Sequence, residues 1–315
     1  MSASKIALVF PGQGSQKVGM LAQAHEHFQS VRDTFAEASQ TLGYDMWDLV
    51  QNGDQAALNL TETTQPVLLT SSVALWRAWL EQGGPSPALM AGHSLGEFSA
   101  LVCAGALAFS DAVQLVRQRG AFMQSAVPVG EGAMAAIIGL DDDAINKVCA
   151  DTAAATGQVV AAVNFNSPGQ VVIAGHSSAV EAAIDALKEA GAKRAMPLPV
   201  SAPFHTELMR PAGERLAEAM ADIRFAVPEV PVVHNVNAAT ESDPDRIRAL
   251  LVEQIYSPVQ WTRCVAAIAA AGVVDIVECG PGKVLSGLNR RIDKTLRSHS
   301  LEQPDELAST LQALT

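Results

Sequence analysis

The chain has 315 residues, of which 49% are hydrophobic, and its formal net charge is −12. This length suits one large domain, or a large domain with a smaller companion, and supplies a sizeable apolar core. The negative charge argues against nonspecific nucleic-acid binding, and no apolar run approaches the roughly 18 residues of a membrane span. Four scattered cysteines without a C-x-x-C spacing predict reduced thiols rather than zinc ligands, and residues 1–5 carry no signal-peptide pattern, so a cytoplasmic protein is expected.

Apolar strands and helical patterns alternate along most of the chain. Strands are expected at residues 5–10, 88–92, 230–236 and 272–278. Helices are expected at about 17–41, 64–82, 111–126, 205–222, 244–255, 259–271 and 283–293, with another that begins at Leu95. Such alternation predicts an α/β fold with a mostly parallel sheet that helices cover on both faces.

The rhythm changes between residues 130 and 200. Strands are expected at 133–140, 158–164, 170–174 and 193–200, with helices at 141–154 and 178–190. The order βαββαβ is that of ferredoxin-like domains. We therefore predict a small domain at 130–200 inserted into a discontinuous large domain at 1–129 and 201–315.

The second strand leads into the motif G-x-S-x-G, with Gly92, Ser94 and Gly96, and an apolar helical pattern follows. Strand, abrupt turn and helix form the context in which this motif presents a nucleophile. The glycines relieve crowding at the turn, and the main-chain N–H of Leu95 lies in the first turn of the helix, where it has no helical partner. The pattern favours a nucleophilic Ser94 over an ordinary strand–helix joint.

The glycine-rich segment 11–16 follows the first strand but matches neither of the two common nucleotide-binding motifs. The third glycine of G-x-G-x-x-G would fall at Lys17, and the Walker sequence is absent. The segment is a turn at the carboxyl end of a parallel strand, where open α/β sheets bind ligands. Its amides either supply a second oxyanion donor or form a purely structural turn.

A nucleophilic serine needs a base, and the chain has seven histidines. His25, His27 and His299 lie in polar surroundings and are expected to be solvated, whereas the backbone directs His93 away from its neighbour Ser94. His205 follows a stiff, proline-rich segment and opens a predicted helix, whose positive end favours a neutral imidazole. We select His205 as the base, with His234 as the alternative and a structural role equally open.

Arg119 lies in the middle of the core-facing stripe of the helix at 111–126. A buried guanidinium is costly unless it is paired, so Arg119 either pairs with an internal carboxylate such as Glu97 or binds an anionic ligand. No acid between Ser94 and His205 stands out as the group that orients the histidine. This absence weighs against a plain α/β-hydrolase esterase.

Several segments together resemble the malonyl-CoA:acyl-carrier-protein transacylases of bacterial fatty-acid synthesis. They occur in the family's order: 11–16, 92–97, 118–120, 164–170, 203–205 and 257–261. The resemblance implies an α/β-hydrolase-like core with a ferredoxin-like insert. It also implies malonyl transfer from malonyl-CoA to the phosphopantetheine thiol of an acyl carrier protein.

The resemblance assigns a role to each matched position. Ser94 is the nucleophile, His205 its base, Arg119 the ligand of the malonyl carboxylate, and Gln13 and Leu95 the main-chain oxyanion donors. The main-chain carbonyl of Gln260 orients the histidine. The substrate pocket is expected to include four further side chains: Phe204, Asn164, Asn166 and His93.

The implied reaction proceeds through a malonyl-serine ester and needs no metal or redox cofactor, and a monomer is expected. Because carrier proteins of this pathway are acidic, a chain of net charge −12 needs a local basic patch to receive one. Lys193 and Arg194 are candidates, as is a C-terminal group: Lys283, Arg290, Arg291, Lys294 and Arg297.

Three other functions stay open at this point. A thioesterase or esterase would use the same nucleophile with water as the acceptor. A catalytically silent docking module would bind carriers without forming an ester. A loading acyltransferase of a polyketide pathway would share the chemistry and differ in its carrier, although the chain length without flanking domains favours fatty-acid synthesis.

Overall fold

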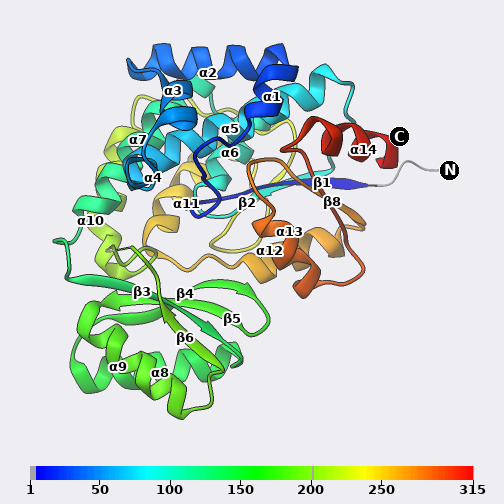
Figure 1. The fold of residues 1–315 in the computed structure, drawn as a ribbon. Helices are drawn as coiled ribbons and strands as arrows, with labels where there is room; N and C mark the ends of the chain where they lie inside the picture. Colours follow the sequence, from blue (N-terminus) through cyan, green and yellow to red (C-terminus); the bar gives the residue numbers. More distant parts are fainter. Residues whose placement is uncertain (1–4, 201, 315) are drawn as a thin grey trace.

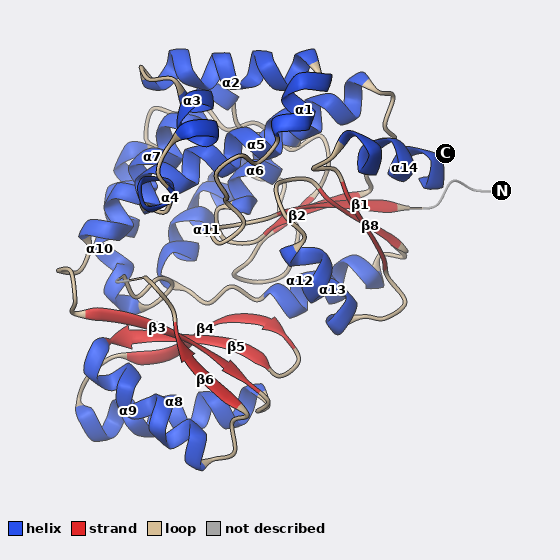
Figure 2. Ribbon diagram, viewed as in Figure 1, coloured by secondary structure: helices blue, strands red, loops and turns tan. Residues whose placement is uncertain are grey.

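The structure is a computed structural model that describes residues 5–200 and 202–314. It contains two separate sheets, one parallel and one antiparallel (Figure 2). Two of the predictions fall outside the described residues. They concern residues 1–4, where the sequence carries no signal-peptide pattern, and residue 201, the expected start of the second large-domain segment. Within the described part, no helix is both long enough and apolar enough to cross a bilayer.

The large sheet has the strand order β7-β2-β1-β8-β9, and all neighbouring strands are parallel. Its strands are β1 (Ile6–Phe10), β2 (Leu89–Gly92), β7 (Val232–Val233), β8 (Asp275–Glu278) and β9 (Arg297–Ser300). Side chains of β1 alternate between two apolar cores: Leu8 and Phe10 face one, and Ala7 and Val9 face the other. This burial on both faces confirms the predicted α/β class.

Helices cover both faces of the large sheet (Figure 1). One face packs against a layer that includes α2 (Gln29–Leu42), α5 (Thr61–Glu81), α6 (Gly96–Cys103) and α7 (Phe109–Ser125). The other face packs against α12 (Trp261–Ala270) and α13 (Val284–Ile292). The remaining helices of the large part are α1 (Ala22–His27), α3 (Met46–Asn52), α4 (Gln55–Leu58), α10 (Arg210–Ala219), α11 (Pro244–Tyr256) and α14 (Pro304–Leu314).

The small sheet has the order β4-β5-β3-β6 and is antiparallel. Its elements are β3 (Gly132–Ile138), α8 (Asp142–Thr156), β4 (Val160–Ser167), β5 (Gln170–His176), α9 (Ser177–Glu189) and β6 (Arg194–Pro197), which is the predicted βαββαβ sequence. One face packs on α8 and α9, whereas Met134, Val163 and Val172 join the core of the large part. The Phe165 N–H donates to the Val259 carbonyl at 3.0 Å, so β4 also pairs with the segment before α12.

Some predicted elements differ from the structure. The helix expected at 17–41 is two helices, because Phe28 is extended between α1 and α2. The helix expected from His205 begins later, with a 3-10 turn (Glu207–Met209) before α10, and His205 itself has a φ of 63°. The short helices α3 and α4, the strand β9 and the helix α14 were not predicted from the sequence. His299 consequently lies in β9 and is not in a polar tail.

Candidate active site

The turn after β2 holds Ser94 in a left-handed backbone conformation, with a φ of 49°. Glycine is required on both sides of it. A Cβ at Gly92 would lie 1.8 Å from the carbonyl carbon of Gly96, and a Cβ at Gly96 would lie 2.0 Å from the Phe10 carbonyl oxygen. The positive φ is strained for a serine, and such strain is typical of functional turns that the surrounding structure holds in place.

Ser94 and His205 meet although 111 residues separate them in the chain, and the Ser94 Oγ lies 2.9 Å from the His205 Nε2. The His205 Nδ1 lies 2.7 Å from the main-chain carbonyl oxygen of Gln254. A carbonyl only accepts, so Nδ1 carries the proton and Nε2 is left to accept from the serine hydroxyl. The arrangement is that of a nucleophile beside a base that a third group orients.

The orienting carbonyl was predicted wrongly. Gln260 precedes α12, and its carbonyl accepts the first helical hydrogen bond from the Cys264 N–H at 2.9 Å. Gln254 lies in the last turn of α11, where carbonyls have no partner within the helix. It is this carbonyl, without a helical partner, that His205 contacts, and not that of Gln260.

His205 is 4% exposed. Burial, followed by the nearby positive charge of Arg119, lowers the pKa of His205 to about 3. The imidazole is thus neutral around pH 7, as a general base must be. The Nδ1 of the alternative base, His234, lies 2.7 Å from a Glu97 carboxylate oxygen, whereas it is His205 that contacts the Ser94 hydroxyl.

Arg119 of α7 is 1% exposed and reaches the same hydroxyl, its Nη2 donating to the Ser94 Oγ at 3.1 Å. Its other partners are neutral: Nη1 donates to the Gln65 Oε1 and Nη2 to the Gln254 Oε1, each at 2.8 Å. Among the described residues the Nε–H has no acceptor, and no carboxylate lies within ion-pair distance of the guanidinium. Of the two alternatives for Arg119, the pairing with an internal carboxylate such as Glu97 is therefore not present as a direct contact.

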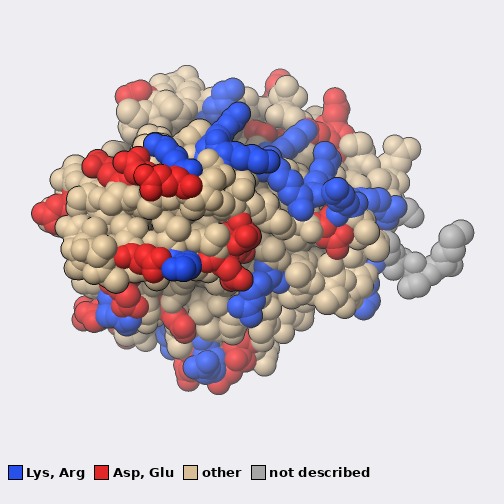
Figure 3. Space-filling view, turned by 90° about the horizontal axis from the view of Figure 1, so that it is seen from below, with Lys and Arg blue, Asp and Glu red and all other residues tan. Residues whose placement is uncertain are grey.

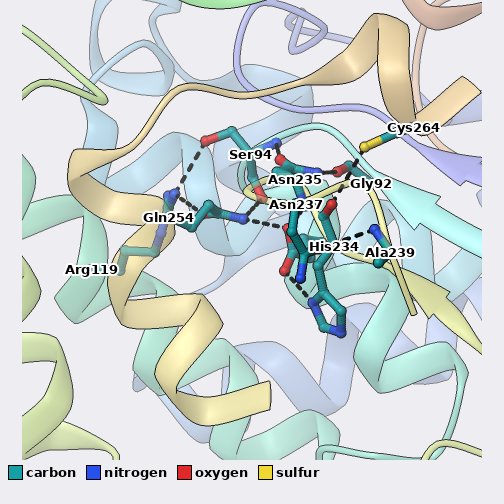
Figure 4. Close-up of polar contacts among 10 residues, drawn as sticks. Gly92, Ser94, Arg119, His234, Asn235, Asn237, Ala239, Gln254 and Cys264 are labelled. Atoms are coloured by element: carbon teal, nitrogen blue, oxygen red, sulfur yellow. Dashed lines mark hydrogen bonds and ion pairs between the residues drawn. The ribbon is translucent and has the colours of Figure 1, made fainter. Parts of the chain in front are cut away.

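Two buried amides support the site from behind (Figure 4). The Asn235 Oδ1 accepts from the Ser94 N–H at 2.7 Å, and its Nδ2 donates to the Gly92 carbonyl at 2.7 Å. The Gln254 Nε2 donates to the Ser94 carbonyl at 3.1 Å and to the Glu97 carboxylate at 2.8 Å. The sequence analysis did not identify Gln254 or Asn235. The one available signal was the position of Gln254 on the apolar stripe of α11, beside Leu250 and Leu251.

A cavity of about 120 Å³ opens beside the Ser94 hydroxyl. Predicted pocket residues that line it are His93, Asn164 and Phe204, with Gln13 and Leu95 also at its wall. Asn166 does not line the cavity, and its Oδ1 lies 2.8 Å from the His93 Nε2 instead. The rest of the wall is largely apolar and includes Met123 of α7 with Met134 and Leu198 from the small sheet and the segment after it.

The main-chain N–H groups of Gln13 and Leu95 bear on the oxyanion prediction. Neither donates a hydrogen bond to any other residue within 5–200 and 202–314. Unpaired amide donors beside a nucleophile are the arrangement that stabilises a developing oxyanion. Within those same ranges, no group of three or more His, Cys, Asp or Glu side chains is arranged to hold a metal ion.

The chain matches the family described as the acyl transferase domain over residues 7–313. It is 59% identical over 309 residues to the malonyl CoA-acyl carrier protein transacylase of Escherichia coli, covering 98% of this chain and 99% of that relative. Its identity to the Bacillus subtilis protein of the same name is 46% over 313 residues, covering 99% and 98%.

Solved structures are similar over the same length. The malonyl CoA-acyl carrier protein transacylase of Coxiella burnetii superposes with a TM-score of 0.98 at 48% identity, covering 99% of this chain and 98% of that one. A malonyl-transacylase in complex with its type II PKS acyl-carrier protein gives a TM-score of 0.97 at 54% identity, covering 98% and 100%. The chain therefore belongs to the acyl transferase family, among the malonyl CoA-acyl carrier protein transacylases.

Proposed function

We propose that this protein transfers a malonyl group from malonyl-CoA to the phosphopantetheine thiol of an acyl carrier protein through an ester on Ser94. One observation carries the proposal: the Ser94 Oγ lies 2.9 Å from the His205 Nε2 and 3.1 Å from the Arg119 Nη2. The same hydroxyl therefore faces a neutral base and a buried cation. A base activates the nucleophile, and a cation selects an acyl group that ends in a carboxylate.

In the first half-reaction His205 takes the proton from Ser94 as the Oγ attacks the thioester carbonyl. The Gln13 and Leu95 N–H groups stabilise the oxyanion. The C–S bond then breaks, the proton passes from His205 to the CoA thiolate, and malonyl-O-Ser94 remains. In the second half-reaction the pantetheine thiol gives its proton to His205 and attacks the ester carbonyl. The C–O bond then breaks, and the proton passes from His205 to the Ser94 Oγ, which regenerates the serine. Each half-reaction converts a thioester into an ester or the reverse, and it consumes neither an oxidant nor a reductant. We place the activity in the cytoplasm.

The hydrogen bonds of Arg119 suit this sequence of states. Before the reaction one N–H of Nη2 is donated to the Ser94 Oγ. After acylation that oxygen is an ester oxygen, which is a poor acceptor. The N–H is then released and joins the donors of Nε and Nη1 that have no acceptor within the described chain. A guanidinium with free donors binds a carboxylate through two parallel hydrogen bonds.

The carrier is proposed to dock over the small sheet and α13. Lys193 and Arg194 are exposed at the start of β6, and Arg291 of α13 donates to Gln170 at the start of β5. Basic side chains gather along the upper right of the face in Figure 3, although acidic groups are interspersed. Local positive charge would attract an acidic carrier despite the negative net charge.

Intact mass spectrometry tests the proposal. After brief exposure to malonyl-CoA the wild-type protein gains one malonyl group, and Ser94→Ala gains none. Ser99→Ala is a matched control in α6, the helix that follows the Ser94 turn. The Ser99 hydroxyl has no hydrogen-bond partner in the described part of the chain, so this variant retains labelling. Addition of a phosphopantetheinylated carrier then removes the label faster than water does. Rapid loss in water alone would indicate a thioesterase instead.

A type II polyketide carrier is the second candidate acceptor, because a similar malonyl-transacylase is solved in complex with one. Discharge rates of malonyl-Ser94 by a fatty-acid carrier and by a type II polyketide carrier distinguish the two. We expect the fatty-acid carrier to react faster, and the reverse order would assign the protein to the polyketide pathway.

A further inference from the structure

Glu97 of α6 is a fully buried carboxylate that takes no part in the transfer described above. Its Oε2 accepts from the Asn235 N–H at 2.9 Å and from the Gln254 Nε2 at 2.8 Å, and its Oε1 lies 2.7 Å from the His234 Nδ1. Burying a carboxylate is costly unless donors satisfy it. Two N–H donors and a histidine ring nitrogen therefore converge on the two carboxylate oxygens.

This carboxylate determines which way the Gln254 amide faces. The two ends of an amide are opposite in hydrogen bonding, because the nitrogen only donates and the oxygen only accepts. With Nε2 directed at Glu97 and at the Ser94 carbonyl, the Oε1 faces Arg119, where it accepts from Nη2 at 2.8 Å. The reverse orientation would place the amide oxygen against the carboxylate and the amide nitrogen against the guanidinium, and both contacts would be repulsive.

We infer that Glu97 is a positioning residue for acyl-group selection, which acts by fixing the Gln254 amide that holds the Arg119 guanidinium. The inference rests on the proposed function, since it explains how the malonyl-binding cation is aimed. The Gln254 main-chain carbonyl also orients His205, so one residue of α11 aligns both the base and the cation.

The relay through a neutral amide has an electrostatic consequence. Glu97 makes no direct ion pair with Arg119, so the cation keeps donors for a substrate carboxylate. At the same time the negative charge of Glu97 favours the charged guanidinium, and it opposes the burial that lowers the pKa of Arg119 to about 9. A direct contact would give the same support but would occupy the donors.

Glu97 also contacts Asn235, which holds the Ser94 turn. If Glu97 were only structural, its removal would disturb this turn. The two roles differ in their dependence on the acyl group. Damage to the turn slows acylation of Ser94 by any thioester. Misdirection of Arg119 slows acylation by malonyl-CoA and spares acetyl-CoA, which has no free carboxylate.

The test measures the rate of Ser94 acylation by malonyl-CoA and by acetyl-CoA, using quenched intact-mass time courses. For Glu97→Gln we expect kcat/KM for malonyl-CoA to fall about tenfold or more, and that for acetyl-CoA to fall less than about threefold. Asn235→Ala is the matched control, because within the described residues its side chain hydrogen-bonds to the Ser94 and Gly92 main chain and not to Gln254 or Arg119. It should slow both thioesters in similar proportion. His234→Asn keeps an N–H donor for Glu97 and should retain the wild-type selectivity.

A proportional fall for both thioesters in Glu97→Gln, or no fall, would overturn the inference. Should Glu97→Gln not fold, Gln254→Met tests the link of the relay that contacts Arg119, because it removes the amide and keeps the main-chain carbonyl that orients His205. The selective loss of malonyl transfer is again expected, and a non-selective loss again overturns it. A wild-type protein that takes no malonyl group at Ser94 would instead refute the proposed function.

Discussion

The buried charged groups at the two ends of the parallel sheet have different kinds of partner. At the start of β8 the Asp275 carboxylate is 1% exposed and is met by cationic or protonatable groups: the Arg297 Nη2 at 2.6 Å and the His299 Nε2 at 2.9 Å. At the carboxyl end, Arg119 is equally buried but meets neutral oxygens from Gln65, Gln254 and Ser94.

The difference separates a structural charge from one that is reserved for a ligand. The ion pairs of Asp275 are completed within the protein, and the group needs nothing further. Arg119 is desolvated and hydrogen-bonded, yet the described residues supply no counter-ion in contact with it. A buried cation without a paired anion is costly, and a substrate carboxylate is the group that would relieve this cost.

Removal of the cation gives the largest expected effect. Arg119→Ala should lower kcat/KM for malonyl-CoA about a hundredfold or more, because a buried charge-assisted contact with the acyl carboxylate is lost. Acetyl-CoA should be affected far less. Acylation of Ser94 by the two thioesters, followed by intact mass, checks this ratio. Equal losses would mean that Arg119 serves the nucleophile and not the acyl group.

Supplying the missing counter-ion makes the carboxyl end resemble the other end. In Gln65→Glu a carboxylate replaces the amide oxygen that accepts from Arg119 at 2.8 Å, so the protein itself neutralises the guanidinium. We expect KM for malonyl-CoA to rise about tenfold, with a smaller change in KM for acetyl-CoA. An unchanged KM for malonyl-CoA would contradict the view that the cation is kept unpaired for the substrate.

The matching change at the amino end should affect stability alone. Asp275→Asn removes the charge that Arg297 and His299 share, and the thermal midpoint should fall by about 2–5 °C. The ratio of malonyl to acetyl labelling should equal that of the wild type. A change in this ratio would show that the two ends of the sheet are coupled, and it would contradict a purely structural role for Asp275.

The pH dependence gives the smallest expected change. The pKa of His205 is about 3 in the folded protein and 6.5 for an ordinary histidine, so the neutral base persists well below pH 6.5. The rate of Ser94 acylation should therefore vary less than about twofold between pH 7 and pH 5. In Arg119→Ala the acid limb should move to higher pH, because a cation that disfavours protonation is gone. A wild-type acid limb centred near 6.5 would contradict this.

The same shift affects stability. The unfolded chain binds a proton at this histidine more readily than the folded protein does. Its contribution to stability is therefore complete above pH 6.5 and is lost as the pH falls toward 3. Unfolding by denaturant at pH 7 and at pH 5 measures how much the free energy of unfolding falls. A His205→Gln variant should lack the part of this fall that comes from residue 205.

Local patterns in the sequence predicted the parts of the site that depend on local structure. Ser94 stands out because strand, glycine turn and helix occur within a few residues, and Arg119 because a charge interrupts an apolar helical stripe. The two sheets and the βαββαβ order followed from periodicity, and the α/β class was confirmed.

Contacts between distant segments could not be predicted in this way. Gln254 interrupts the apolar stripe of α11 as Arg119 interrupts that of α7. Burying an uncharged amide costs less than burying a cation, so its position predicts a functional role less strongly. Whether its carbonyl or that of Gln260 reaches His205 depends on where α11 ends and α12 begins, and helix ends are poorly fixed by sequence patterns. Asn166 failed as a pocket residue because its side chain faces His93 rather than the cavity.

The position of the acyl carboxylate in the malonyl-Ser94 enzyme tests the central claim most directly. In a crystal of the wild-type protein exposed to malonyl-CoA, we expect two hydrogen bonds of about 2.7–2.9 Å between this carboxylate and Arg119, with Gln65 and Gln254 still holding the guanidinium. A carboxylate directed into solvent, with Arg119 bound only to its amide partners, would contradict the account.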